Sequence, residues 1–298
     1  MAGQNTRADR SATGTVREAA LHHAANAARA LGSLRPTDID VHRARKEIKK
    51  SRAALRLLRA ALAEATYRRD DAALRRAARA LNAVRDARVL ARTLDSLRRR
   101  RVALAKDKAA AALALLLRRR QAQARHQLRR LPELLAGARG TLQQVQQRAR
   151  GWRMGQHGWS ALGPAFRRIY RAGRRAGHAA RRCPDAPTLH EWRKKVQFLC
   201  HALLILKPLQ SRAPPKIGGL ARRLAEYLGE DHDLALLHSA VLAFGRRHEP
   251  ASEPLLAAID RRRRALQIKA MAAGKRLYAK KPRALAARVG RRCAPRRP

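Results

Sequence analysis

The chain has 298 residues, of which 69 are Lys or Arg and 21 are Asp or Glu, so its formal net charge is +48. This imbalance excludes the surface of mixed signs that is typical of soluble enzymes, and it favours a polyanionic partner that lies against the cations. Because 46% of the residues are hydrophobic, we expect the chain to fold. Aromatic residues make up only 3%, which argues against base stacking as the mode of recognition.

An all-α fold is predicted, because apolar residues recur at intervals of three and four between segments marked by Pro, Gly, Asp and Asn. Residues 1–14 are predicted to be disordered, and residues 280–298 to form a basic flexible tail. The expected helices lie near residues 16–34, 40–64, 71–82, 84–101, 104–130 and 138–151, and, after a glycine-rich stretch at 151–159, near 160–182, 188–207, 214–228, 231–247 and 253–277.

The sequence repeats itself at an offset of 148 or 147 residues. VHRARKEI at 41 matches LHEWRKKV at 189, and LRRAARALNAVRDARVL at 74 matches ARRLAEYLGEDHDLALL at 221. The matched positions are His42 with His190, Arg45 with Arg193, Lys46 with Lys194, Arg75 and Arg76 with Arg222 and Arg223, and Asp86 with Asp233. We therefore predict two related helical bundles in one domain over residues 15–279, with repeat one at 15–150 and repeat two at 152–279, packed about a pseudo-twofold axis.

The expected helix from Val41 carries a cationic stripe beside a buried seam. Its apolar residues advance by threes and fours or their sum, with Ser51 filling the one longer step: Val41, Ala44, Ile48, Leu55, Leu58 and Leu62. At roughly 100° per residue, the stripe beside them contains His42, Arg45, Lys46, Lys49, Arg52, Arg56 and Arg59. An extended anion with one charge per repeat unit could contact several of these side chains at once. The alternative is an ordinary solvated face, which the scarcity of acids disfavours.

The second copy of this helix has fewer cations. It keeps an apolar seam, but its polar stripe retains only His190, Arg193, Lys194 and Lys207. Gln197, Cys200 and Leu204 occupy the positions equivalent to Lys49, Arg52 and Arg56. Any anion site between the two copies is therefore expected to be asymmetric, with more cations from the first helix than from the second.

Asp86 and Asp233 each follow a residue that readily ends a helix, Asn82 and Gly229 respectively. Each is expected in the first turn of the next helix, where the macrodipole favours a carboxylate. Each could also orient a basic side chain from the cationic helix of its own half. Both roles can hold together.

These residues resemble the CHAD domain, the conserved histidine alpha-helical domain. The resemblance rests on VHRARKEIKKSRAALRLL and LHEWRKKVQFLCHALLIL, followed by LNAVRD and LGEDHD. It implies two four-helix bundles with internal pseudo-symmetry that bind inorganic polyphosphate in a basic cavity or groove, in many bacteria at polyphosphate granules. The family's histidines correspond to His42 and His190, and its basic positions to Arg45, Lys49, Lys50, Arg52, Arg193 and Lys194. The second helix departs from the family at Gln197, Phe198 and Cys200.

The predicted polyphosphate-binding set combines the stripe, its second copy and the family positions. It consists of His42, Arg45, Lys46, Lys49, Lys50, Arg52, Arg56, Arg75, Arg79, His190, Arg193, Lys194, Arg222 and Arg223, with Asp86 and Asp233 as orienting carboxylates. No catalytic role, cofactor or metal site is expected, because no Gly-rich phosphate loop, nucleophile motif or convergent ligand spacing occurs. Two alternatives are a nonspecific nucleic-acid-binding protein, since a basic protein binds nucleic acid at low salt, and an adaptor that coats granules or recruits granule-associated proteins.

A cytoplasmic location is expected, at polyphosphate granules if the resemblance holds. Three scattered cysteines, Cys183, Cys200 and Cys293, fit neither a disulfide framework nor a paired-cysteine zinc site, which indicates a reducing compartment. The first residues lack the apolar core of a signal peptide, and no run of 18 apolar residues predicts a membrane segment.

Overall fold

Every regular element in the described part of this computed structural model is helical, which confirms the all-α prediction. The structure describes residues 2–33, 37–101, 104, 106–130, 132–210, 217–245 and 252–293, without the side chains of 2–11, 83–85 and 128–130. The α-helices are α1 (Ala2–Ala30), α2 (Asp38–Leu57), α3 (Glu64–Ala80), α4 (Asn82–Arg100), α6 (Lys108–Arg130), α7 (Pro132–Arg150), α8 (Gly158–Arg182), α9 (Ala186–Leu206), α10 (Ile217–Gly245), α11 (Glu253–Leu277) and α12 (Pro282–Cys293), and short 3-10 turns follow α2 (Leu58–Ala60) and α9 (Lys207–Leu209).

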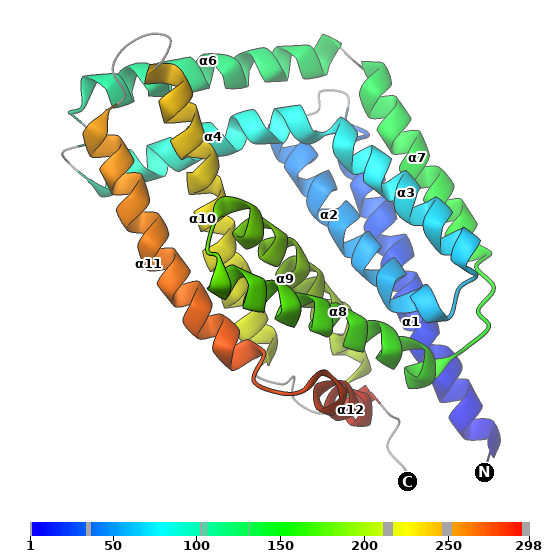
Figure 1. Cartoon of the computed structure of the whole chain (residues 1–298). Helices are drawn as coiled ribbons and strands as arrows, with labels where there is room; N and C mark the ends of the chain where they lie inside the picture. The colour runs from blue at the N-terminus through cyan, green and yellow to red at the C-terminus, as the bar shows by residue number, and fades with distance from the viewer. Residues whose placement is uncertain are drawn as a thin grey trace.

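The helices form two groups that share a long interface (Figure 1). In the first group α1, α2, α3 and α7 pack together, and in the second α8, α9, α10 and α11 pack in sequence, with α12 against α8. Helices α4 and α6 form a hairpin, and α4 packs on α10. The groups meet where α2 packs on α9 and α1 on α8. The internal duplication and its pseudo-twofold axis stay predictions.

A single apolar cluster extends through both groups. It includes Ile48 and Leu55 of α2 together with Val196 and Leu199 of α9, and all four side chains are fully buried. A smaller cluster joins the α4–α6 hairpin to the far ends of α10 and α11. Because burial of apolar surface is the main stabilising term in folding, the two halves stabilise each other across the α2–α9 contact. None of the described helices combines the length and the hydropathy needed to cross a membrane.

The prediction of disorder at the amino terminus is wrong over most of its length. Helix α1 begins at Ala2, and Ala12, Thr13 and Val16 are buried. The hydroxyl of Thr13 lies 3.3 Å from Nδ1 of His157. Ala12 and Thr13, the described buried residues of this segment, continue the buried face of α1 from Val16 and add a turn to the core.

The prediction of a flexible basic tail is also wrong for residues 282–293, which form α12. Leu285, Ala286 and Val289 are buried against α8, and their spacing of one, three and four residues defines a helical face. The density of arginine in this segment had obscured that short seam. Residues 294–298 lie outside the described part, as do the expected helix ends at residues 34, 214–216 and 246–247.

Helix α10 runs without interruption from Ile217 to Gly245, so the predicted break at Gly229 is wrong. Buried residues follow one another at intervals of three and four along the whole helix, through Leu228, Asp231 and Leu234. A single interior glycine costs a helix only about 1 kcal/mol, and this seam offsets that cost. Asp233 therefore lies in mid-helix, and Asp86 is the fifth residue of α4 and lies just beyond its first turn.

The indole of Trp192 is the largest fully buried side chain and lies against two glycines of neighbouring helices. A Cβ atom at Gly274 of α11 would lie 2.5 Å from the indole, and a Cβ atom at Gly177 of α8 would lie 3.0 Å from it. The close approach of α8 and α11 to α9 therefore requires the absence of side chains at these positions.

We expect Gly274→Ala to destabilise the protein by about 2 kcal/mol, because the indole cannot move within a packed core. Gly140→Ala is the matched control, since apart from the adjoining backbone of its own helix no atom lies within 4 Å of a Cβ atom built at this position. That change should stabilise the protein by up to about 1 kcal/mol, because alanine favours the helix. Urea unfolding measures both, and two effects of the same sign would contradict the packing described for Trp192.

Candidate functional site

Hydrogen bonds at their first turns and buried apolar residues along their lengths fix how α2 and α9 are rotated about their own axes. At the start of α2, the Thr37 hydroxyl accepts a hydrogen bond from the Asp40 amide (3.3 Å) and the Asp40 carboxylate accepts one from the Thr37 amide (3.0 Å). At the start of α9, the carboxylate of Asp185 accepts a hydrogen bond from the Thr188 amide (2.8 Å). Since the apolar seams of both helices are buried, their polar stripes lie along the edges of the α2–α9 contact.

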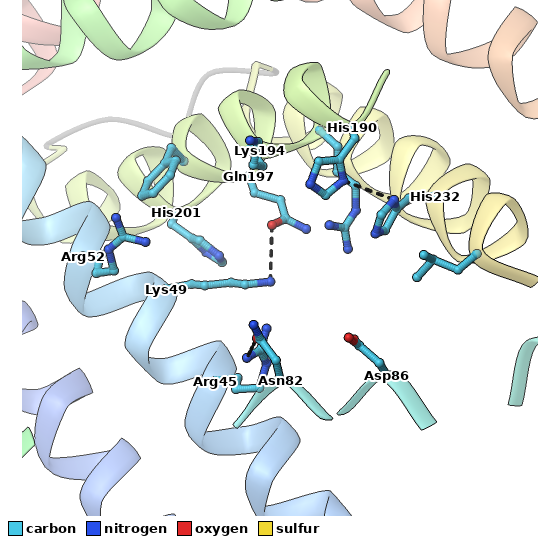
Figure 2. Close-up of a pocket in the computed structure, with 13 residues that line it drawn as sticks. Arg45, Lys49, Arg52, Asn82, Asp86, His190, Lys194, Gln197, His201 and His232 are labelled. Atoms are coloured by element: carbon cyan, nitrogen blue, oxygen red, sulfur yellow. Dashed lines mark hydrogen bonds between the residues drawn. The ribbon is translucent and has the colours of Figure 1, made fainter. Parts of the chain in front are cut away.

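A cationic cleft of about 430 Å³ opens between these two stripes (Figure 2). Arg45, Lys49 and Arg52 of α2 face side chains of α9 across it, and residues of α4 and α10 line its other end. The lining residues are Arg45, Lys49, Arg52, Asn82, Asp86, His190, Arg193, Lys194, Gln197, Phe198, His201, His232 and Leu236. Among these described residues, five carry a permanent positive charge and one, Asp86, carries a carboxylate.

Each α2 cation of the cleft is held by a neighbour. Arg45 donates to the backbone carbonyl of Ala78 and to the side-chain amide oxygen of Asn82. The ammonium of Lys49 donates to Oε1 of Gln197 on α9 (3.4 Å), a contact that crosses the cleft in Figure 2. Such contacts lower the conformational entropy that these long side chains would lose on binding an anion.

Arg52 and Arg56 are positioned by two residues that sequence analysis assigned no role. Nε of Arg52 donates to the carboxylate of Asp71 (2.9 Å), which also pairs with Arg75 (3.2 Å). The ring of Phe198 lies 3.7 Å from the guanidinium of Arg56 and 5.5 Å from that of Arg52. The one signal for Phe198 in the sequence was the departure from the resemblance at this position. Asp71 gave no comparable signal.

Glu47 and Glu191 are two further carboxylates that hold cations near the cleft. Burial alone would raise the pKa of Glu47, but hydrogen bonds from Lys50 and His23, both 2.6 Å long, outweigh it and hold that pKa below its usual range. On α9, hydrogen bonds from Lys194 and then Lys195 lower the pKa of Glu191 to about 2. The ammonium groups of Lys50 and Lys194 are therefore partly neutralised by neighbours on their own helices.

Two histidines from different helices meet at the end of the cleft. Nδ1 of His190 lies 3.1 Å from Nδ1 of His232, and the ring centroids are 4.3 Å apart. A hydrogen bond between these atoms requires that one Nδ1 carries the proton and the other does not. No three His, Cys, Asp or Glu side chains converge as metal ligands within the described residues.

The predicted site residues are divided among several surfaces. Seven of them line the cleft, among them Asp86, whereas His42 and Asp233 line a neighbouring groove of about 880 Å³ between α4, α10 and α11. A third hollow, of about 910 Å³ between α2, α9 and α10, is lined by Lys46, Lys50, Arg222 and Arg223. Arg75 and Arg79 are exposed on α3. His201, His232 and Gln197 of the cleft were absent from the predicted set.

The helical fold and this concave surface define an all-α protein with a cationic cleft. The chain matches the family model for the CHAD domain over residues 15–242, and it belongs to that family. Its fold is similar to the structure of PptA from Streptomyces chartreusis, with a TM-score of 0.63 at 16% identity, over 90% of this chain and 99% of that one. The CHAD domain from the plant Ricinus communis gives a TM-score of 0.58 at 18% identity, over 92% of this chain and 90% of that one. A comparison with curated proteins found no match.

His201 provides a test of the electrostatics of the cleft. Burial, followed by the charges of Lys49 and Lys50, lowers its pKa from 6.5 to about 4. Between these values the folded protein binds fewer protons at His201 than the unfolded chain does. The contribution of His201 to stability is therefore complete above pH 6.5 and is lost as the pH falls toward 4.

We expect Lys49→Met to raise the pKa of His201, because the variant removes a repelling charge. Lys195→Met also removes one charge, but Lys195 is not among the charges that lower the pKa of His201, so this control should leave the pKa unchanged. NMR titration of the imidazole, assigned with His201→Gln, measures the pKa of His201. A wild-type midpoint at 6.5 would show that the cleft is wetter and less positive than described.

Proposed function

We propose that this protein binds inorganic polyphosphate in the cationic cleft and does not catalyse its turnover. The observation that carries the proposal is that cations of α2 and α9 converge on one hollow, although Arg45 and Arg193 are 148 residues apart in the sequence. The converging cations are Arg45, Lys49, Arg52, Arg193 and Lys194. Membership of the CHAD family supports the same ligand. We further propose that the protein acts in the cytoplasm at polyphosphate granules.

The shape of the cleft favours a flexible linear polyanion over a duplex. From Arg45 to Arg52 the α2 wall extends about 10 Å, and the α9 wall faces it, so a ligand must present charge in two directions within a narrow space. A phosphate chain carries charge on every unit and can bend between the walls. Duplex DNA, with a persistence length of about 50 nm, can contact only the rim.

The non-catalytic part of the proposal rests on the composition of the cleft walls. Asp86 is the one carboxylate among the described lining residues, so acid–base chemistry would have to fall to the histidines. His190 and His232 contact each other, which makes them more suitable as hydrogen-bond donors to phosphate than as paired acid and base. Incubation with polyphosphate followed by a phosphate-release assay tests this point, and turnover above that of a Lys49→Gln variant would contradict it.

The cleft variant Arg45→Gln, Lys49→Gln, Lys194→Gln should bind polyphosphate at least about tenfold more weakly than the wild type, because three charge-assisted contacts are lost. The control variant Arg168→Gln, Arg175→Gln, Arg182→Gln removes the same charge from the exposed face of α8. It should lose far less affinity. Isothermal titration calorimetry measures both variants, and equal losses would mean that net charge alone determines binding.

Nonspecific nucleic-acid binding is the second candidate, favoured by the sequence pI of about 12.0. Long-chain polyphosphate should displace duplex DNA and tRNA from the protein at physiological salt, because only the flexible chain reaches the cleft walls. Fluorescence anisotropy of labelled DNA, with competitors at equal phosphate concentration, measures the displacement. Equal affinities for the three polyanions would favour the nucleic-acid function.

A further inference from the structure

A second concave surface, the groove between α4, α10 and α11, contains more arginine than the cleft. Its volume of about 880 Å³ is roughly twice that of the cleft. We call it the arginine groove, after its seven arginines, Arg88, Arg92, Arg99, Arg100, Arg101, Arg261 and Arg262. None of these arginines belonged to the predicted binding set, although the runs LRRRR at 97 and RRRR at 261 are conspicuous in the sequence.

The two walls of the arginine groove are regular helical faces. On α4, Arg88, Arg92, Ser96 and Arg99 follow one another at intervals of four, four and three residues, so they lie along one side of the helix for about 17 Å. The other wall is α11, which carries Arg261 and Arg262. Both α4 and α11 pack on α10, which places Gly229, Asp233 and Leu234 between the walls. The arginines are therefore displayed by rigid elements.

Positive charge in the arginine groove exceeds the carboxylates that line it. Glu226, Glu230 and Asp233 are the acids among the described lining residues, which leaves an excess of four positive charges. Glu230 accepts two hydrogen bonds from Arg262, at 2.8 and 3.0 Å. Within the described residues, the exposed side chains of Arg92, Arg99 and Arg261 have no carboxylate within 4.0 Å. Their guanidinium groups are available to a bidentate phosphate ligand.

The arginine groove adjoins the cleft along three helices. On α2, His42 of the groove is one turn from Arg45 of the cleft, about 4.5 Å along the axis. On α10, Asp233 of the groove directly follows His232 of the cleft, and on α4, Arg88 is two residues beyond Asp86. A linear polyanion that leaves the α4 end of the cleft therefore meets the groove next.

We propose that the arginine groove is a second polyphosphate-binding segment, which takes the part of a long chain that extends beyond the cleft. The proposal rests on the proposed function. A short phosphate chain is held by the cleft alone, whereas a long chain contacts the arginines of α4 and α11 as well. The groove thereby makes affinity depend on chain length and gives the protein a preference for long polyphosphate.

The test compares tripolyphosphate and long-chain polyphosphate as ligands for three forms of the full chain. The groove variant is Arg92→Gln, Arg99→Gln, Arg261→Gln, and the control is the α8 variant Arg168→Gln, Arg175→Gln, Arg182→Gln, which has the same net charge. Calorimetry over a salt series gives affinities and salt dependence, and circular dichroism verifies that each variant is folded. All six substituted arginines are exposed, so folding should be retained.

We expect the groove variant to bind long-chain polyphosphate about tenfold more weakly than the α8 control does. Both variants should bind tripolyphosphate with the same affinity. Its log–log salt slope for the long chain should flatten by about 2, if each lost phosphate contact contributes about 0.7, as for single strands. Equal long-chain affinities of the groove and α8 variants would overturn the inference and leave the proposed function standing. An equal loss for both ligands would overturn the dependence on chain length. If the wild type binds neither tripolyphosphate nor long-chain polyphosphate, the proposed function itself is overturned.

Discussion

Mutual repulsion among positive side chains is the constraint on which this structure depends. With 69 basic and 21 acidic residues, the chain can fold only if its few carboxylates lie where they offset the most repulsion. The buried acids do this between helices. Asp70 of α3 is fully buried and binds Arg148 of α7 (2.8 Å) and the indole nitrogen of Trp152 (3.0 Å). Asp38 of α2 accepts hydrogen bonds from Gln121 (2.7 Å) and Arg125 (3.0 Å) of α6, and Asp231 of α10 accepts one from Arg263 of α11 (3.2 Å).

This distribution of acids explains why the concave surfaces are so positive. Carboxylates that join helices are not available to neutralise the walls of the cleft and the arginine groove, each of which is left with an excess of four positive charges among its described lining residues. Charge inside a concave surface with low-dielectric walls gives a stronger local potential than the same charge on a convex face. A polyanion that lies in either surface therefore relieves repulsion among the lining cations. The proposed anion binding and the placement of the buried carboxylates both follow from the same imbalance of charge.

From the sequence one could predict on which face of a helix a side chain lies, but not which helix packs opposite that face. The period of Val41, Ala44 and Ile48 was enough to predict the seam of α2 and hence the stripe that carries Arg45 and Lys49. The internal repeat was enough to match that stripe with Arg193 on α9. Helical periodicity says nothing about which helices approach the stripe, so the division of its residues between the cleft, the groove and the third hollow could not be predicted. The contact of Phe198 with Arg56 depends on the packing of α9 on α2, and the short seam of α12 was hidden by its arginines.

The single apolar cluster that joins the two groups of helices couples the stability of one group to that of the other. If the chain were cut in the glycine-rich segment between α7 and α8, each fragment would expose its half of the apolar interface to water. Neither fragment should therefore fold stably alone. In the intact chain, a ligand that contacts both α2 and α9 binds only when the two groups of helices are packed together. Such a ligand shifts the global unfolding equilibrium toward the folded state by mass action. The melting temperature, and with it the cellular lifetime of the protein, would then rise and fall with the supply of its anion.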